Sequence, residues 1–337
     1  YLTLGIFGMA LLARRLDIGW TGSIVAGLSF GLSGYHALHL AVGHINFAGA
    51  LLYPLLLYFF IRSTEDLRHL IWAGAVAGWI ASLGGTFTPA MAGEVLILWA
   101  TMQALWPMES EQHTGSRLRD GLRVYGLLVA LGLLALCLSA YRMLPTLEFI
   151  LDHPRPPFRR TPDVTLLKQV VFDLFAYRDF GPLSGRKYWS HEYTARLPAV
   201  IAPLLLLALP AGLQPRWRRL TLVLGGLGLA SVLLCLGNFS PLAPWSILQK
   251  LPVLRDLRVP SRHLILVVFF AALLAGVGAQ LVIEQVARWR SSGASQNPGG
   301  GWSRKACPSR APSPGAGRGR RGCAADGPPS ARTSPPP

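Results

Sequence analysis

The chain has 337 residues, of which 51% are hydrophobic and only 14% are charged, and its mean hydropathy is +0.39. This composition excludes an ordinary soluble domain and indicates a protein that crosses a membrane several times. The net charge of +16 does not indicate a nucleic-acid-binding protein, because the Lys and Arg residues lie between apolar runs or in the C-terminal tail. The four Cys residues indicate no disulfide framework, since Cys137 and Cys235 fall inside apolar runs.

Long apolar runs predict an all-α fold, a polytopic bundle of transmembrane helices within residues 1–290. A run of about twenty apolar residues crosses the hydrocarbon core of a bilayer, which is about 30 Å thick. The run 1–13 is shorter, so we expect it to be the second half of a helix that begins before Tyr1. The other runs predict about eight full crossings, at 19–35, 47–61, 70–83, 90–106, 122–144, 197–213, 220–236 and 264–283.

Glycine and proline residues refine this pattern at two places. Gly84, Gly85 and Pro89 separate the runs 70–83 and 90–106, because these residue types interrupt helices. Gly27 and Gly31 have the four-residue spacing of small side chains that lets a neighbouring helix approach closely. We therefore expect a turn after residue 83 and tight helix packing around 19–35.

Short basic loops predict the orientation of the bundle, because cytoplasmic loops are enriched in Lys and Arg. With a turn at 84–89, the loops that hold basic residues all fall on one side of the membrane: Arg14 and Arg15, Arg62 and Arg68, Arg117, Arg119 and Arg123, Arg216, Arg218 and Arg219, and Arg288 and Arg290. The connector 36–46 and the loops 145–196 and 237–261 are then extracytoplasmic. Both long outer loops carry more cations than carboxylates, which indicates an anionic ligand on that side.

A cluster of arginines stands at the start of the last apolar run. Arg255, Arg258 and Arg262 surround Pro260 and lead directly into 264–283. Guanidinium groups bind oxyanions through two parallel hydrogen bonds, so this cluster suits a lipid phosphate at the membrane surface. Simple anchoring at the interface is the equal alternative. A second candidate set for lipid phosphate lies in the first outer loop and consists of Arg155, Arg159 and Arg160.

The first outer loop also predicts an interfacial helix at 166–175. Its expected apolar face is formed by Leu166, Leu167, Val170, Val171, Leu174 and Phe175, whereas Lys168, Gln169 and Asp173 lie off that face. An aromatic and polar patch follows at 177–193. Within this patch Tyr188, Trp189 and Tyr193 are candidates for stacking on a sugar ring, and His191 or Glu192 for proton exchange near neutral pH. The favoured alternative is an aromatic belt at the interface.

Other candidate residues are fewer. His36, His39 and His44 are close in sequence but have no acidic neighbour, so they give little support to a divalent metal site, and we expect no cofactor. Glu94 is an acid deep within a predicted crossing and is a functional candidate for that reason. Glu148 follows Pro145 at an outer helix end, where water hydrates the carboxylate, so its presence needs no functional role. No phosphate-binding loop, dinucleotide fingerprint or nucleophile elbow is present.

Residues 291–337 differ from the rest of the chain. They are rich in Gly, Pro, Ser and Arg and contain almost no aliphatic residues, so we expect a disordered tail. A natural flexible tail is one interpretation. An out-of-frame translation of GC-rich coding sequence is the other, and it is the one we favour.

Three stretches resemble one bacterial family. They are LPVLRDLRVPSRHLILVVFFAALLAGVG at 251–278, RMLPTLEFI at 142–150, and SFGLSGY at 29–35 followed by GHINFAGALLYPLLL at 43–57. Together they resemble the YfhO-like bacterial integral-membrane proteins, which are grouped with the GT-C type glycosyltransferases. The resemblance covers most of residues 1–290 in order. GGTFTPA at 84–90 departs from the Gly-His-Pro-Gln-like turn of the family at that place.

The resemblance implies a multi-pass enzyme of the bacterial cytoplasmic membrane. Such an enzyme transfers a sugar from a polyprenyl-phosphate donor to a cell-envelope glycan on the extracytoplasmic side, and its catalytic acid is expected upstream of Tyr1. The arginines named above would then stabilise the charge of the leaving lipid phosphate. The alternative is a non-catalytic membrane protein, such as a transporter or lipid flippase, whose outer arginines only anchor it. An acidic residue in a large outer loop before Tyr1 would favour the enzyme.

Overall fold

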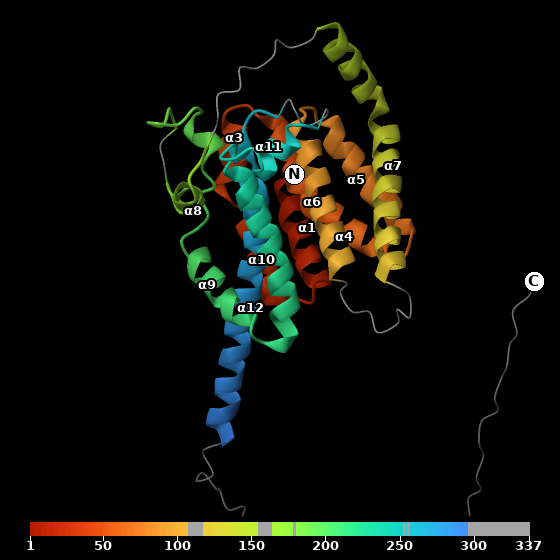
Figure 1. The fold of residues 1–337 in the computed structure, drawn as a ribbon. Helices are drawn as coiled ribbons and strands as arrows, with labels where there is room; N and C mark the ends of the chain where they lie inside the picture. The colour runs from red at the N-terminus through yellow and green to blue at the C-terminus, as the bar shows by residue number, and fades with distance from the viewer. Residues whose placement is uncertain (107–116, 154–163, 178–179, 252–253, 255–256, 296–337) are drawn as a thin grey trace, which may run out of the picture. The chain divides into compact units, whose positions relative to one another are not determined.

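The computed structural model describes residues 1–106, 117–153, 164–177, 180–251, 254 and 257–295. Every regular element in these ranges is a helix, which confirms the predicted all-α fold, and two isolated bridges join Val164 to Gly237 and Pro182 to Trp189. Residues 1–291 form one compact unit (Figure 1). The tail predicted at 291–337 lies outside the described residues, except for 291–295, which end the last helix.

The chain forms twelve α-helices and three 3₁₀ turns within the described residues. In order they are α1 (Leu2–Arg15), α2 (Trp20–Gly31), α3 (Gly34–Ala41), η1 (Ile45–Leu52), α4 (Tyr53–Ser63), α5 (Arg68–Ser82), α6 (Phe87–Leu105), α7 (Arg117–Asp152), α8 (Leu167–Phe175), η2 (Ser190–Glu192), α9 (Ile201–Ala211), α10 (Pro215–Cys235), α11 (Pro244–Leu248), η3 (Pro260–His263) and α12 (Leu264–Ser295).

Within the part of the chain that the structure describes, five helical segments are long and apolar enough to cross a membrane, so the chain is a helical membrane protein. These segments are Trp20–Ala41, Ile45–Ser63, Arg119–Phe149, Pro215–Cys235 and Pro260–Ser291. The remaining predicted crossings fall on shorter or less apolar helices. The shortest is α9, with 11 residues, and at 1.5 Å per residue it extends only about 16 Å. The count of about eight full crossings therefore stays a prediction.

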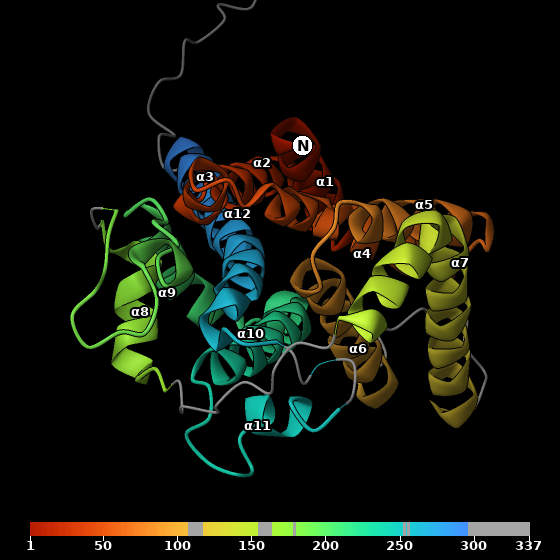
Figure 2. The ribbon, with the colours of Figure 1, turned by 90° about the horizontal axis from the view of Figure 1, so that it is seen from above.

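The first part of helix α12 is deeply buried, and its apolar side chains from Leu264 to Leu273 are all less than one tenth exposed. It lies between the α2–α3 segment and α10 (Figure 2). Glycines permit the closest approaches, because a Cβ atom on Gly22 of α2 would lie only 2.3 Å from the carbonyl oxygen of Gly276. The close helix packing predicted from the spacing of Gly27 and Gly31 is confirmed, since both residues pack against Ile6 of α1.

The predicted break between α5 and α6 is confirmed, whereas the predicted end of α7 is wrong. Gly84 and Gly85 adopt φ angles of +89° and +79°, a left-handed conformation that ends α5. Helix α7 was expected to stop at Pro145 but continues to Asp152. Pro145 lacks the N–H that would bond the preceding turn, yet the Thr146 hydroxyl donates to the Arg142 carbonyl oxygen over 2.8 Å and binds the backbone there.

A helix, α8, forms where the interfacial helix was expected, and its position on the membrane stays a prediction. Val170, Asp173 and Leu174 are buried against the protein, and Leu167 and Val171 are more than half exposed. Asp173 lies off the predicted apolar face. It is only 2% exposed because the Arg186 guanidinium group, 2.9 Å away, neutralises its charge inside the protein.

Contacts between connecting segments fall into two groups. In one group Arg15 pairs with Glu65, Arg123 donates to the Thr64 carbonyl oxygen, and Arg216 pairs with Glu284, so several basic loops contact one another. The other group joins segments that were predicted to be extracytoplasmic, including 34–46, 165–196 and 257–263. The contacts thus group the loops as the charge pattern does, and the assignment of each group to a side of the membrane stays a prediction.

Candidate functional site

An ion pair between Glu192 and Arg262 lies at the centre of the second group of loops. The Arg262 guanidinium group donates from Nε to Oε2 of Glu192 over 2.8 Å and from Nη2 to Oε1 over 2.5 Å. Glu192 belongs to the short turn η2, and Arg262 to η3, whose first residue is Pro260, a residue suited to the start of a helix. Two segments distant in sequence therefore meet through a bidentate pair.

Aromatic rings enclose the guanidinium group of Arg262. Its Cζ atom lies 4.3 Å from the ring centroid of Phe87 and 5.1 Å from that of Phe47. The Tyr35 hydroxyl donates to the backbone carbonyl oxygen of Arg262 over 3.1 Å. A guanidinium group between ring faces gains cation–π attraction while it keeps its hydrogen bonds. Both the side chain and the backbone of Arg262 are thus fixed in place.

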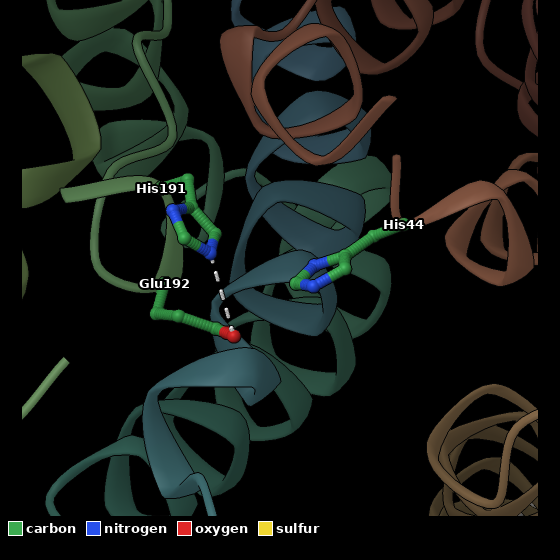
Figure 3. A group of neighbouring side chains, drawn as sticks. All are labelled: His44, His191 and Glu192. Carbon is green, nitrogen blue, oxygen red and sulfur yellow. Dashed lines mark ion pairs between the residues drawn. The ribbon is translucent and has the colours of Figure 1, made fainter. Parts of the chain in front are cut away.

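Histidine side chains gather beside this pair. His44 and His191, together with Glu192, each offer one metal-ligand atom, and these atoms all lie within 4.8 Å of one another. Figure 3 shows the three side chains pointing toward one another, with Nε2 of His191 3.7 Å from Oε1 of Glu192. His39 stands behind His44, and the two Nδ1 atoms are 3.1 Å apart. The arrangement offers two nitrogen ligands and one oxygen ligand.

The electrostatic surroundings keep both outer histidines neutral. Burial lowers the pKa of His44, and the charge of Arg262 lowers it further, although the Glu192 carboxylate acts in the opposite direction. Burial also lowers the pKa of His191, again against the effect of Glu192 and with smaller contributions from His44 and Arg262. A neutral imidazole has a lone pair available, so both rings are in the form that binds metal ions.

The residues predicted to contact a sugar have different environments. Trp189 is 50% exposed and meets the ring of Phe180 at a centroid distance of 5.3 Å. The Tyr188 hydroxyl donates to the backbone carbonyl oxygen of Arg258 over 3.2 Å. Tyr193 is only 1% exposed and lies under the guanidinium group of Arg186. Of these aromatic rings, Trp189 is the one most accessible to a ligand.

The predicted phosphate-binding arginines are only partly described. Arg258 and Arg262 lie in the segment 257–263, and Arg262 is already paired with Glu192. The remaining candidates, Arg255, Arg155, Arg159 and Arg160, lie outside the described residues.

The structure groups the histidines differently from their spacing in the sequence. His36 does not join the candidate ligands but packs edge-on against Phe30, with centroids 5.0 Å apart. His44 instead finds its partners in the distant segment that holds His191 and Glu192. The sequence analysis noted each of these residues, but no local pattern indicated that the two segments meet.

A second polar pair lies deeper in the helices. Oε2 of Glu94 in α6 is 2.9 Å from Nε2 of His263, and their side chains are 9% and 0% exposed. Nδ1 of His263 lies 3.0 Å from the Pro260 carbonyl oxygen and donates its proton there, so a hydrogen bond between Nε2 and the carboxylate needs a second proton, carried by Nε2 or by Glu94. The isolated acid of the sequence analysis thus has a basic partner. Glu148, the other acid noted there, is exposed.

Comparison of the chain with protein-family models, with curated proteins and with solved structures found no match.

Proposed function

We propose that the chain is part of a membrane glycosyltransferase that uses a polyprenyl-phosphate-linked sugar donor, and that the donor binds where Glu192 meets Arg262. One observation carries the proposal. The segment selected for sugar binding, 177–193, contacts the segment selected for phosphate binding, 255–262, through the Glu192–Arg262 pair and the bond from Tyr188 to Arg258. A lipid-linked sugar needs both functions side by side.

The chemistry of the pair is compatible with a phosphate ligand. A guanidinium group has five N–H donors, and Glu192 receives bonds from only two nitrogens of Arg262. The donors left over are available to a phosphate oxygen while Glu192 keeps the group oriented. A positive group held in advance stabilises the charge that develops on a leaving lipid phosphate.

Exposed aromatic rings supply the second part of the proposed site. Trp189 and Phe180 are each 50% exposed and lie edge to face beside His191. Such rings stack on the apolar face of a sugar, and His191 and Glu192 are close enough to exchange protons with its hydroxyl groups. The acceptor in this proposal is a cell-envelope glycan on the outer side of the bacterial cytoplasmic membrane.

Lipid binding by the purified chain tests the proposal. We expect a short polyprenyl phosphate to raise the melting temperature in detergent, and the corresponding polyprenol, which lacks the phosphate, to have a much smaller effect. Arg258→Ala should weaken phosphate binding roughly tenfold or more, the loss of about one charge-assisted hydrogen bond. Arg218→Ala, at an exposed position in the first turn of α10, is the matched control. Equal responses to the two lipids, or equal losses in the two variants, would reject the proposal.

The buried Glu94–His263 pair favours a second candidate, a transporter or lipid flippase. A carboxylate and an imidazole in contact within a helix bundle are the groups that proton-coupled transporters use. In that case Glu94→Gln should abolish proton-coupled lipid or solute movement in proteoliposomes. It should leave polyprenyl-phosphate binding unchanged, because Glu94 lies outside the proposed donor site.

A further inference from the structure

We infer that His44, His191 and Glu192 form a binding site for a divalent transition-metal ion of the zinc class. In tetrahedral zinc sites the metal lies about 2.0–2.2 Å from each nitrogen or oxygen ligand, which places neighbouring ligand atoms about 3.4 Å apart. Nε2 of His191 and Oε1 of Glu192 are 3.7 Å apart, and all three ligand atoms lie within 4.8 Å of one another (Figure 3). Small side-chain rotations bring this set to the required geometry.

The neighbour of His44 fixes which of its nitrogens faces the ion. Nδ1 of His44 lies 3.1 Å from Nδ1 of His39, so one of these atoms donates a hydrogen bond to the other. If His44 donates, its Nε2 keeps a free lone pair. Metal-binding histidines almost always donate their other N–H group to an acceptor that holds the ring in place. Nδ1 of His39 is the atom placed to accept that hydrogen bond.

Arg262 does not prevent the ion from binding. A carboxylate has about four lone-pair positions, and the hydrogen bonds from Arg262 occupy two of them. An ion bound at a remaining lone pair would lie about 2 Å from the carboxylate oxygen, closer than the guanidinium nitrogens at 2.5 and 2.8 Å, so the attraction exceeds the repulsion. Arg262 instead orients Glu192, as outer hydrogen-bond partners do in metal sites.

The ligand set selects the class of ion. Two imidazoles and one carboxylate suit Zn²⁺ and neighbouring transition metals better than Mg²⁺ or Ca²⁺, which prefer oxygen ligands. Three protein ligands leave a fourth position open, as in catalytic zinc sites. If the proposed function holds, a phosphate oxygen of the lipid donor takes that position, and the ion adds to the positive charge that Arg262 supplies.

Metal binding by the whole chain in detergent is the direct test, and it needs no activity. After treatment with a chelator and removal of the chelator, the protein is incubated with Zn²⁺, desalted and analysed for bound metal. We expect one Zn²⁺ per chain and a higher melting temperature, because an ion that binds only the folded state stabilises it. Co²⁺ in place of zinc should give the strong visible absorption of a four-coordinate site.

Substitutions locate the ion. His44→Gln and His191→Gln should each lose the bound zinc, the thermal shift and the cobalt spectrum, whereas His69→Gln, at a partly exposed position in the first turn of α5, should keep all three. Both site variants retain the Glu192–Arg262 pair, so their folding can be checked without metal. No zinc uptake by the native chain, or equal uptake in all variants, would overturn the inference.

A separate experiment distinguishes the metal site from the proposed function. The two are linked because the binding of a lipid phosphate oxygen to the ion depends on the proposed function. Binding of polyprenyl phosphate is measured with and without Zn²⁺. Lipid binding by a chain that takes up no zinc would overturn the metal site and leave the proposed function standing. Zinc uptake without any lipid binding would support the metal site and count against the glycosyltransferase.

Discussion

The guanidinium group of Arg262 spans both carboxylate oxygens of Glu192, and the two side chains are only 16% and 6% exposed. Burying either charged group without the other would cost free energy, because a charge without a partner is unfavourable in a medium of low polarity. The pair therefore joins the turn η2 to the start of α12.

Removing one member of this pair should destabilise the protein. Glu192→Gln leaves the charge of Arg262 buried without its partner, and breaking a buried pair in this way costs about 3–5 kcal/mol. Arg262→Met should cost a similar amount. The double variant should lose much less than the sum, and a double-mutant cycle from unfolding in detergent measures the difference. Additive losses would show that the two side chains are not coupled.

The pair between Arg186 and Asp173 offers a comparison with an exposed pair. Its side chains are 6% and 2% exposed, so Asp173→Asn should destabilise the protein by about 3–5 kcal/mol. Glu65, which pairs with Arg15, is 50% exposed, and Glu65→Gln should change the stability by about 0–1 kcal/mol. Unfolding of both variants under the same conditions checks the order. A larger loss for Glu65→Gln would contradict the described burial.

Glycine substitutions should have opposite effects in two helices. A Cβ atom on Gly276 would lie 2.7 Å from the carbonyl oxygen of Gly22, so Gly276→Ala forces α2 and α12 apart at a cost of about 1–3 kcal/mol. Gly226 in α10 has no atom within 4 Å of its Cβ position. There Gly226→Ala should stabilise the helix by about 0.5–1 kcal/mol. Melting temperatures of the two variants should therefore move in opposite directions.

Acid should weaken the folded protein through His44 and His191. Both have a pKa lowered chiefly by burial, so the unfolded chain takes up protons more readily than the folded chain. Their contribution to stability is complete above the unfolded pKa of about 6.5 and is lost as the pH falls toward the lower folded pKa values. Melting temperatures measured with a chelator present should fall between pH 7.5 and 5.5 (about one unit on either side of that value). The fall should be smaller in the variant with both His44→Gln and His191→Gln, and an unchanged fall would exclude these residues as the cause.

Local signals in the sequence predicted the helical fold and several of its details. Gly84 and Gly85 ended a helix as expected, because glycine alone adopts their positive φ angles without strain. The end of α7 was predicted wrongly, because a proline inside a helix removes only one backbone bond and the remaining bonds carry the helix on to Asp152. The burial of Asp173 was not predicted, because it depends on Arg186, which lies beyond the end of α8.

The candidate site was predicted only in parts. His44, His191, Glu192 and Arg262 each attracted notice for their chemistry, but three separate segments supply them. Contacts of this kind depend on how α12 packs between α2 and α10, and no periodicity along one segment reveals them. The metal-ligand set was missed for this reason. Its acid, Glu192, comes from η2, which is distant in sequence from His44.

Two consecutive residues of η3, the turn that leads into α12, contact two different acids. Arg262 binds Glu192 of η2, and His263 contacts Glu94 of α6. The backbone between them is one peptide unit, which is planar and rigid. The chain entering the buried half of α12 is therefore anchored at adjacent positions to two segments that are distant in sequence.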